Sequence, residues 1–179
     1  QKLKQFKKAM LNKMFPKNRA EIPEVRFKGF KEKWIKLEFL NTIDKIIDFR
    51  GRTPKKIGLD WSETGYLALS ALNVKNGYID FTLDPHYGDQ ELYDKWMKGN
   101  ELYKGQVLFT TEAPMGNVAQ IPDNNKYILS QRTIAFEVKK SLITNNFLAV
   151  LLNTPLVFKK LSAFSSGGTA KGVSQKSLS

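Results

Sequence analysis

Cysteine is absent from this sequence of 179 residues, and histidine occurs only once, as His86. Without cysteine the chain cannot form a disulfide scaffold, a thiol nucleophile or a zinc site with sulfur ligands. A single histidine excludes any metal site that needs two. Long apolar runs are also missing, since none approaches the roughly 18 residues of a membrane-spanning helix, and no signal peptide opens the chain. These absences predict a cytoplasmic protein without a bound metal.

Acidic residues are missing from both ends of the chain, although its composition is otherwise that of a globular protein. Lysine and arginine total 29 against 17 acidic residues, which gives a net charge of +12. Residues 1–17 contain six lysines and no acid, residues 138–179 contain six more and no acid, and residues 18–137 are neutral overall. Such segregation is typical of proteins that bind a polyanion. The alternative is that the acidic partners of both ends lie outside this sequence.

The first segment predicts an amphipathic helix over residues 2–15. Pro16 ends this helix, and its apolar side chains recur at spacings of three and four along one face, namely Leu3, Phe6, Met10 and Met14. A lone helix of this length is marginal in water, and it has no N-cap residue. We therefore expect the end of a longer, coiled-coil-type helix that packs against a partner helix, from the rest of the protein or from a second copy.

Four segments follow from these patterns. We expect the end of a coiled-coil-type helix over residues 1–17, a polar linker over 18–33, one domain over 34–173, and the start of a truncated following segment over 174–179.

The domain is predicted to be α+β, with a mixed or antiparallel sheet and flanking helices. Strands come first and helices last, and there is no βαβ alternation. A strand is expected to end at Phe49, and further strand-like runs cover residues 66–72, 77–81, 106–111, 118–121, 127–129 and 133–138. Helices are expected over residues 89–97, over 145–153 behind the N-cap candidate Thr144, and over 155–164 behind Thr154. Phe109, Tyr127 and Phe136 read as core positions.

Two patterns suggest catalysis, but each lacks the surrounding residues or fold that its chemistry requires. Asp84-Pro-His-Tyr87 resembles the tetrapeptide with which amino-methyltransferases hold the target nitrogen, but His86 stands where the second proline belongs. That chemistry also needs a parallel sheet with a glycine-rich cofactor turn, which the chain lacks. His86 as a general base would need a nucleophile, and there is no Gly-x-Ser-x-Gly elbow. We expect no catalytic residue.

Three loops are better candidates, for binding rather than catalysis. The loop 50–56 has four cations and there is no acid from residue 49 to residue 59, and arginine suits guanine edges and phosphate. The turn at 111–117 and the glycine-rich segment 165–172 bring polar side chains to flexible backbone. The candidate DNA contacts are Arg50, Arg52, Thr53, Lys55, Lys56, Thr111, Glu112, Met115, Asn117, Thr169 and Lys171. Each loop also has a purely structural interpretation, as a solvated loop, a hairpin turn or the end of a helix.

Taken in order, these segments resemble the specificity subunit of type I restriction-modification systems. The residues that carry the resemblance span nearly the whole chain: Met14-Phe-Pro16, Pro23-Glu-Val-Arg-Phe-Lys-Gly-Phe30 with Trp34 and Leu37, the Gly-Arg-Thr-Pro loop at 51–54, Leu69-Ser-Ala-Leu-Asn-Val-Lys-Asn-Gly77, Leu108-Phe-Thr-Thr-Glu-Ala-Pro-Met-Gly-Asn117, Ser130-Gln-Arg132 and Ser166-Gly-Gly-Thr-Ala-Lys-Gly-Val-Ser174. The family's full subunit has two recognition domains and two spacer helices, whereas this sequence covers one domain and the tail of one helix.

The resemblance implies a non-catalytic chain that recognises one half of a bipartite DNA target. Methyltransferase subunits would modify adenine with S-adenosylmethionine, a restriction subunit with ATP and Mg would cleave, and this chain would bind no cofactor itself. A basic protein-interaction module and an orphan half-specificity subunit are the alternatives. An RNA-binding domain would instead need aromatic side chains displayed on a sheet face.

Overall fold

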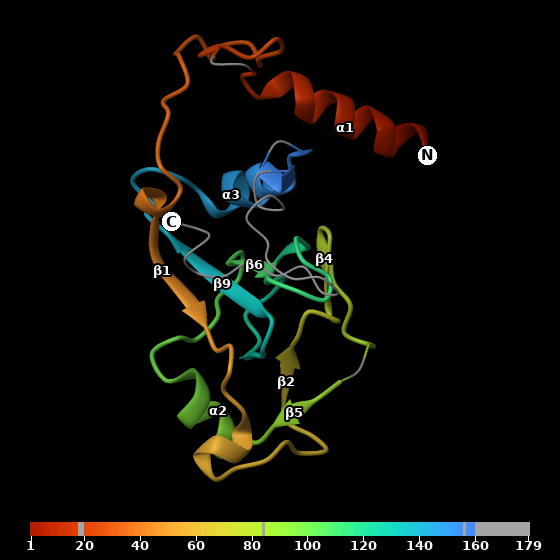
Figure 1. Ribbon diagram of the computed structural model, residues 1–179, viewed down its shortest axis with the longest axis vertical. Coiled ribbons are helices and arrows are strands. Elements are labelled where there is room, and N and C mark those ends of the chain that lie inside the picture. Colours follow the sequence, from red (N-terminus) through yellow and green to blue (C-terminus); the bar gives the residue numbers. More distant parts are fainter. Residues whose placement is uncertain (18–19, 84, 156, 160–179) are drawn as a thin grey trace. The chain divides into compact units, whose positions relative to one another are not determined.

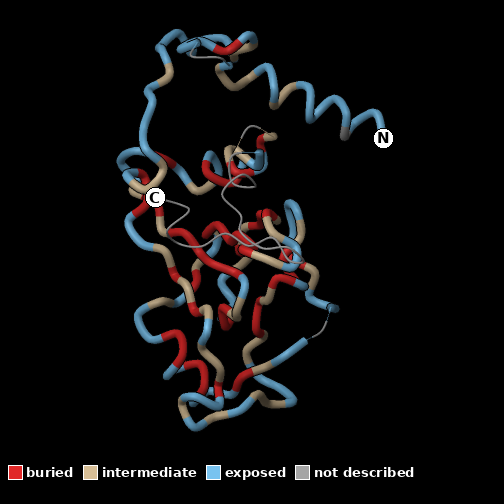
Figure 2. Tube along the Cα trace, in the orientation of Figure 1, coloured by how far each residue is buried: buried red, intermediate tan, exposed pale blue. Residues whose placement is uncertain are grey.

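The structure is a computed structural model that describes residues 1–17, 20–83, 85–155 and 157–159. It divides into two compact units, residues 1–38 and residues 39–179. Figure 1 shows the elements of each unit, and Figure 2 shows that burial is concentrated in the strands and later helices of the second unit.

The first unit consists of helix α1 (Lys2–Met14) and the irregular segment that follows it. The helix ends at Phe15, whose backbone is extended, because Pro16 disfavours helical geometry in the residue before it. The segment then returns to the helix end, where Val25 N–H donates to the Lys13 carbonyl at 3.1 Å and the Phe15 and Trp34 rings lie 5.3 Å apart. The predicted helix is confirmed to within one residue.

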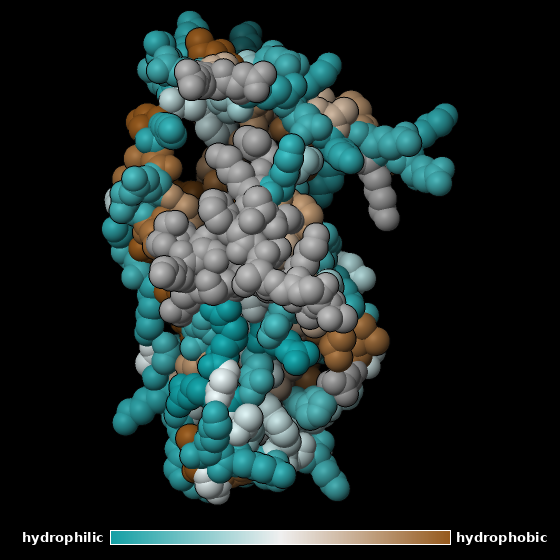
Figure 3. Space-filling model, viewed as in Figure 1, coloured by the Kyte–Doolittle hydropathy of each residue, from teal (hydrophilic) through white to brown (hydrophobic). Residues whose placement is uncertain are grey.

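The apolar face of α1 is exposed at its start. Leu3 is 79% exposed and Phe6 63% exposed, whereas Met10 and Met14 are partly buried. Figure 3 shows hydrophilic side chains projecting from this helix beside smaller hydrophobic areas. Packing against a partner helix is not tested by this single chain, and it stays a prediction.

The second unit is organised by a four-stranded antiparallel sheet, in the order β1-β9-β6-β7. Its strands are β1 (Ile43–Asp48), β6 (Val107–Thr110), β7 (Val118–Gln120) and β9 (Thr133–Val138). Asp48 pairs with Ile134, and Thr110 pairs with Thr133. The chain therefore leaves β1 and β6, and enters β7 and β9, at the same end of the sheet.

One face of this sheet is covered by helix α3 (Asn145–Leu152). Thr144 caps the helix, because its hydroxyl accepts a hydrogen bond from Phe147 N–H at 3.1 Å. Alternate strand residues face the helix and bury a shared core, as the two-residue period of a strand requires. That core comprises Ile43, Val107, Phe109, Val118, Ile134, Phe136, Val138, Ile143, Leu148, Ala149 and Leu152.

The opposite face packs against helix α2 (Gln90–Met97) and a smaller three-stranded sheet, in the order β5-β2-β8. The smaller sheet contains β2 (Tyr66–Leu69), β5 (Tyr87–Gly88) and β8 (Ile128–Leu129). β2 pairs antiparallel with β5 and parallel with β8, so the unit has mixed pairing overall. The α+β prediction is confirmed.

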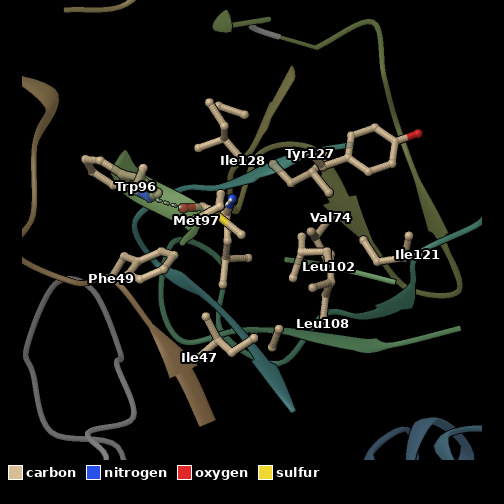
Figure 4. Close-up of a cluster of buried hydrophobic side chains, with 14 of the residues drawn as sticks. Ile47, Phe49, Val74, Trp96, Met97, Leu102, Leu108, Ile121, Tyr127 and Ile128 are labelled. Carbon is tan, nitrogen blue, oxygen red and sulfur yellow. Dashed lines mark hydrogen bonds between the residues drawn. The ribbon is translucent and has the colours of Figure 1, made fainter. Parts of the chain in front are cut away.

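Helix α2 places the largest core side chain. The Asp89 carboxylate caps the helix by accepting a hydrogen bond from Leu92 N–H at 2.8 Å. Trp96 is 2% exposed, and its indole N–H donates to the Leu129 carbonyl at 3.0 Å. Figure 4 shows Trp96 and Phe49 beside Met97 and Ile128 in this cluster. The cluster extends from β1 through α2 to β8.

A two-stranded hairpin, β3 (Val74–Lys75) and β4 (Tyr78–Ile79), is joined by the turn Asn76-Gly77. Only Gly77 of this turn has positive φ, at 90°, a conformation that glycine adopts without steric cost. Asn73 is fully buried beside the hairpin, where its amide donates to the carbonyls of Asp80 and Leu83.

The sequence located most elements, among them the two-residue strands β4 and β8 within the predicted runs 77–81 and 127–129, and it missed several other short ones. The run 133–138 and the helix after Thr144 are as predicted, and Phe109, Tyr127 and Phe136 are buried core residues. Strands β3 and β5 have two residues each, and the 3-10 turns Leu40–Thr42 and Pro54–Ile57 are also short. Such segments cannot show periodicity, so the sequence did not predict them.

The last predicted helix is described only at its start. Pro155 and residues 157–159 are helical, and the Thr154 hydroxyl accepts a hydrogen bond from Val157 N–H at 3.4 Å. The rest of that helix lies outside the described residues, and so does the glycine-rich segment 165–172 with the candidate DNA contacts Thr169 and Lys171.

Candidate nucleic-acid interface

Three loops meet at the end of the sheet where β1 and β6 finish: residues 49–57, 111–117 and 130–132. Gln131 Nε2 donates to the Arg52 carbonyl, which ties the first loop to the third. Thr111 N–H donates to the Arg132 carbonyl at 2.9 Å, which ties the second to the third. Two of the predicted binding loops, far apart in sequence, thus form one continuous edge, which we call the loop end.

The two arginines of the first loop have opposite environments. Arg50 is bonded to Asp48. Its Nε lies 3.0 and 2.9 Å from the two carboxylate oxygens, and its Nη2 also donates to the Asp48 carboxylate. The Asp48 side chain is only 7% exposed. The Arg50 guanidinium compensates this nearly buried carboxylate, and the DNA contact predicted for Arg50 stays a prediction.

Arg52 lies on aromatic rings instead. Its guanidinium carbon is 4.9 Å from the ring centre of Phe49 and 5.3 Å from that of Trp96. Within the described part of the chain, no acceptor bonds the guanidinium N–H groups. Cation–π contact restricts the side chain while leaving its donors available. The Arg52 guanidinium therefore packs on two rings and has donors that no described residue uses.

Two exposed lysines follow, on the 3-10 turn Pro54–Ile57. Lys56 donates from its ammonium to the Gly51 carbonyl at 2.6 Å, which closes the loop on itself. No described residue bonds the Lys55 ammonium. Thr53 is partly buried at the start of this turn, and its side chain makes no capping hydrogen bond.

The second loop corrects the expectation that all four of its candidate side chains are exposed. Thr111 is 1% exposed, because it continues β6 into the interior. Its hydroxyl has no hydrogen-bond partner within the described ranges. Glu112, Met115 and Asn117 are each partly buried. Thr111 cannot touch a ligand unless the loop opens.

The other polar candidates of this loop are partly engaged. Asn117 Nδ2 donates to the Val74 carbonyl at 2.9 Å, which anchors the loop to the β3–β4 hairpin. Glu112 lies 3.3 Å from Arg132 Nε, in a partly exposed ion pair. Gly116, at φ of 94°, lies under the Phe158 ring, and an added Cβ would come within 2.4 Å of that ring. The loop is therefore held from both sides.

This arrangement is that of a rigid sheet carrying a basic loop edge. A model of the type I restriction modification DNA specificity domain matches residues 45–179. The chain belongs to this family. The match covers the four-stranded sheet except for the first two residues of β1, and every loop at its end.

Comparison with solved structures supports the same fold. One chain, from a study of the structural basis underlying complex assembly and conformational transition of the type I R-M system, superposes with a TM-score of 0.60 at 17% sequence identity. The alignment covers 99% of the present chain and 38% of that chain. The specificity domain described here therefore spans well under half the length of that relative. No curated protein matches the sequence.

Membership confirms the resemblance stated from the sequence, and it gives the specificity domain a recognition role rather than a catalytic one. His86 is an exposed side chain whose ring lies 5.9 Å from that of Trp61. Within the described ranges no cluster of acidic and histidine side chains could hold a metal ion, and no helix there could cross a membrane.

Sequence reasoning missed two side chains of the loop end. Arg132 is 57% exposed and has φ of 65°, which is rare for an arginine and typical of functional sites. Gln131 holds the first loop through the Arg52 carbonyl. Ser130-Gln-Arg132 contributed to the family resemblance, but nothing in its composition marked it as a binding segment.

One acid near this edge, Asp80, is hydrogen-bonded to Thr82 and lies near the Lys75 charge. Asp80, after the hairpin, accepts hydrogen bonds from the Thr82 hydroxyl and backbone N–H at 2.7 and 3.0 Å. These bonds, more than the nearby Lys75 charge, lower the pKa of Asp80 below its usual value.

Proposed function

We propose that this chain recognises one half of a bipartite DNA target, as a target recognition domain of a type I specificity subunit, through its loop end. The observation that carries the proposal is the environment of Arg52. Its guanidinium lies over two aromatic rings with its donors available, in a loop with no acid from residue 49 to residue 59. Bidentate donation from arginine to guanine O6 and N7 is the commonest specific contact in the major groove.

The complex would divide the work among subunits. Methyltransferase subunits would bind S-adenosylmethionine and modify adenine, and a restriction subunit would use ATP and Mg. This chain would contribute binding alone, in the cytoplasm with the DNA it reads. The basic residues 1–17 and 138–159 would add sequence-independent attraction to phosphate.

A selection experiment tests this function. Labelled chain is incubated with random-sequence duplex DNA, and bound duplexes are recovered and sequenced over several rounds. We expect enrichment of a short defined half-site. Binding without any enriched sequence, or no binding at low salt, would contradict the proposal.

The exposed lysine of the first loop gives a second test. Lys55→Ala removes a cation that we expect to contact phosphate. It should therefore lower the affinity for the selected duplex and for random duplexes by the same factor. The slope of log affinity against log salt should fall by about 1. Lys104→Ala is the matched control, because Lys104 is equally exposed but precedes β6 at the opposite end of the sheet. Equal slopes in the two variants would remove the first loop from the interface.

We also propose that α1 packs through its apolar face against a second helix of the assembly. Replacing Phe6 and Met10 by aspartate places two charges on that face, so self-association or association with the rest of the subunit should weaken at least tenfold. Sedimentation or light scattering measures the change. The control Gln5→Asp with Asn12→Asp adds the same two charges on the opposite side of α1, where both side chains are exposed, and it should leave association much less affected.

A further inference from the structure

The β3–β4 hairpin adjoins the loop end. Asn117 Nδ2 donates to the Val74 carbonyl at 2.9 Å, Val118 N–H donates to Asn76 Oδ1 at 3.2 Å, and Gly77 N–H donates to the Val118 carbonyl at 2.8 Å. Because β7 is the edge strand of the four-stranded sheet, these bonds hold the hairpin just beyond that edge. The hairpin therefore extends the loop end on the side away from β1.

The two faces of the hairpin differ. Val74 pairs with Ile79, and both are buried in the core. Lys75 pairs with Tyr78 across the strands, so their side chains lie together on the other face. Tyr78 is 58% exposed. No described residue bonds the Tyr78 hydroxyl or the Lys75 ammonium, and the nearby Asp80 carboxylate accepts its hydrogen bonds from Thr82 rather than from Lys75.

The width of the sheet determines which part of a DNA duplex Lys75 and Tyr78 can contact. Strands in a sheet are about 4.8 Å apart, so β1 and β7 are separated by roughly 14 Å, and the hairpin lies farther out. The major groove of B-DNA is about 12 Å wide. If the inner loops enter a groove, elements at the two flanks of the loop end meet the phosphate backbones beside it.

We propose that the β3–β4 hairpin is a phosphate clamp, in which the Lys75 ammonium and the Tyr78 hydroxyl donate to the DNA backbone on the β7 side of the groove. This rests on the proposed function of the loop end. Lys55 holds the backbone on the β1 side, and the two flanks together set how the inner loops enter the groove. Contacts to phosphate fix register without reading sequence.

Two substitutions test the clamp in the full chain. Lys75→Ala should weaken binding by about eightfold at 0.1 M salt, which is the contribution of one released counterion, and lower the salt slope by about 1. Tyr78→Phe keeps the ring and removes the hydroxyl, so it should weaken binding roughly two- to tenfold, by one hydrogen bond. Both effects should be the same on the selected half-site and on random duplexes.

The matched controls make the same chemical changes at the opposite end of the sheet. Tyr103 and Lys104 precede β6. The substitutions Tyr103→Phe and Lys104→Ala should therefore leave the DNA affinity and its salt slope unchanged. Thermal unfolding of all four variants checks that the fold is intact.

The outcomes separate this proposal from the function on which it rests. If the parent chain selects a half-site and both hairpin variants bind as well as the controls, the clamp is wrong and the function stands. A loss confined to the selected half-site also overturns the clamp, because it shows base recognition. If the parent chain binds no DNA, the proposed function fails first.

Discussion

Replacing Arg52 by alanine is expected to cost about 1–3 kcal/mol of affinity for the selected half-site, and much less for random DNA. The guanidinium is supported by Phe49 and Trp96 and donates to no described residue, so its donors are available for a base edge. A base contact is lost only on the sequence that presents the acceptors. Competition binding with both duplexes measures the difference directly.

Arg52→Lys is the sharper control. Lysine keeps the positive charge but loses the planar pair of donors, so the salt slope should be unchanged while discrimination between the duplexes falls. An equal loss on both duplexes for Arg52→Ala would show that this arginine contacts only phosphate. Unchanged binding would place the readout on other side chains of the loop end.

The largest effect on stability is expected from Trp96. Trp96→Ala should lower the free energy of unfolding by about 3–5 kcal/mol, because it leaves a cavity in the core. The indole also donates to the Leu129 carbonyl, and its ring lies 5.7 Å from Phe49 and 6.2 Å from Trp61. Urea unfolding followed by far-UV circular dichroism measures the change.

Trp96→Phe is the matched variant, since it keeps a ring in the cavity and loses only the indole N–H bond and part of the volume. We expect Trp96→Phe to lower the free energy of unfolding by about a third as much as Trp96→Ala does. Equal stability of the alanine variant and the parent would mean that this cluster does not hold the loop end in place. In the fraction that stays folded, the alanine variant should also discriminate DNA less well, because Arg52 loses one of its two rings.

The environments of Arg50 and Arg52 show where sequence reasoning reached its limit. Both stand in one acid-free loop, and the sequence assigned both to DNA. Arg50 forms an ion pair with Asp48, the last residue of β1. The Asp48 carboxylate is nearly buried, so it needs a counter-charge. Trp96 supports Arg52 from a helix more than forty residues further along the chain. No local pattern distinguishes these two outcomes.

The sequence by itself determined the α+β class, most element positions, the absence of cysteine chemistry and the family resemblance. Periodicity, capping residues such as Asp89 and Thr144, and turn chemistry act over a few residues, so they can be read locally. Only the tertiary structure decided that the loops 49–57, 111–117 and 130–132 and the β3–β4 hairpin lie at one end of one sheet. It also decided that Thr111 is buried and Arg132 exposed. Strand order and register set those positions, and both depend on hydrogen bonds between segments distant in the chain.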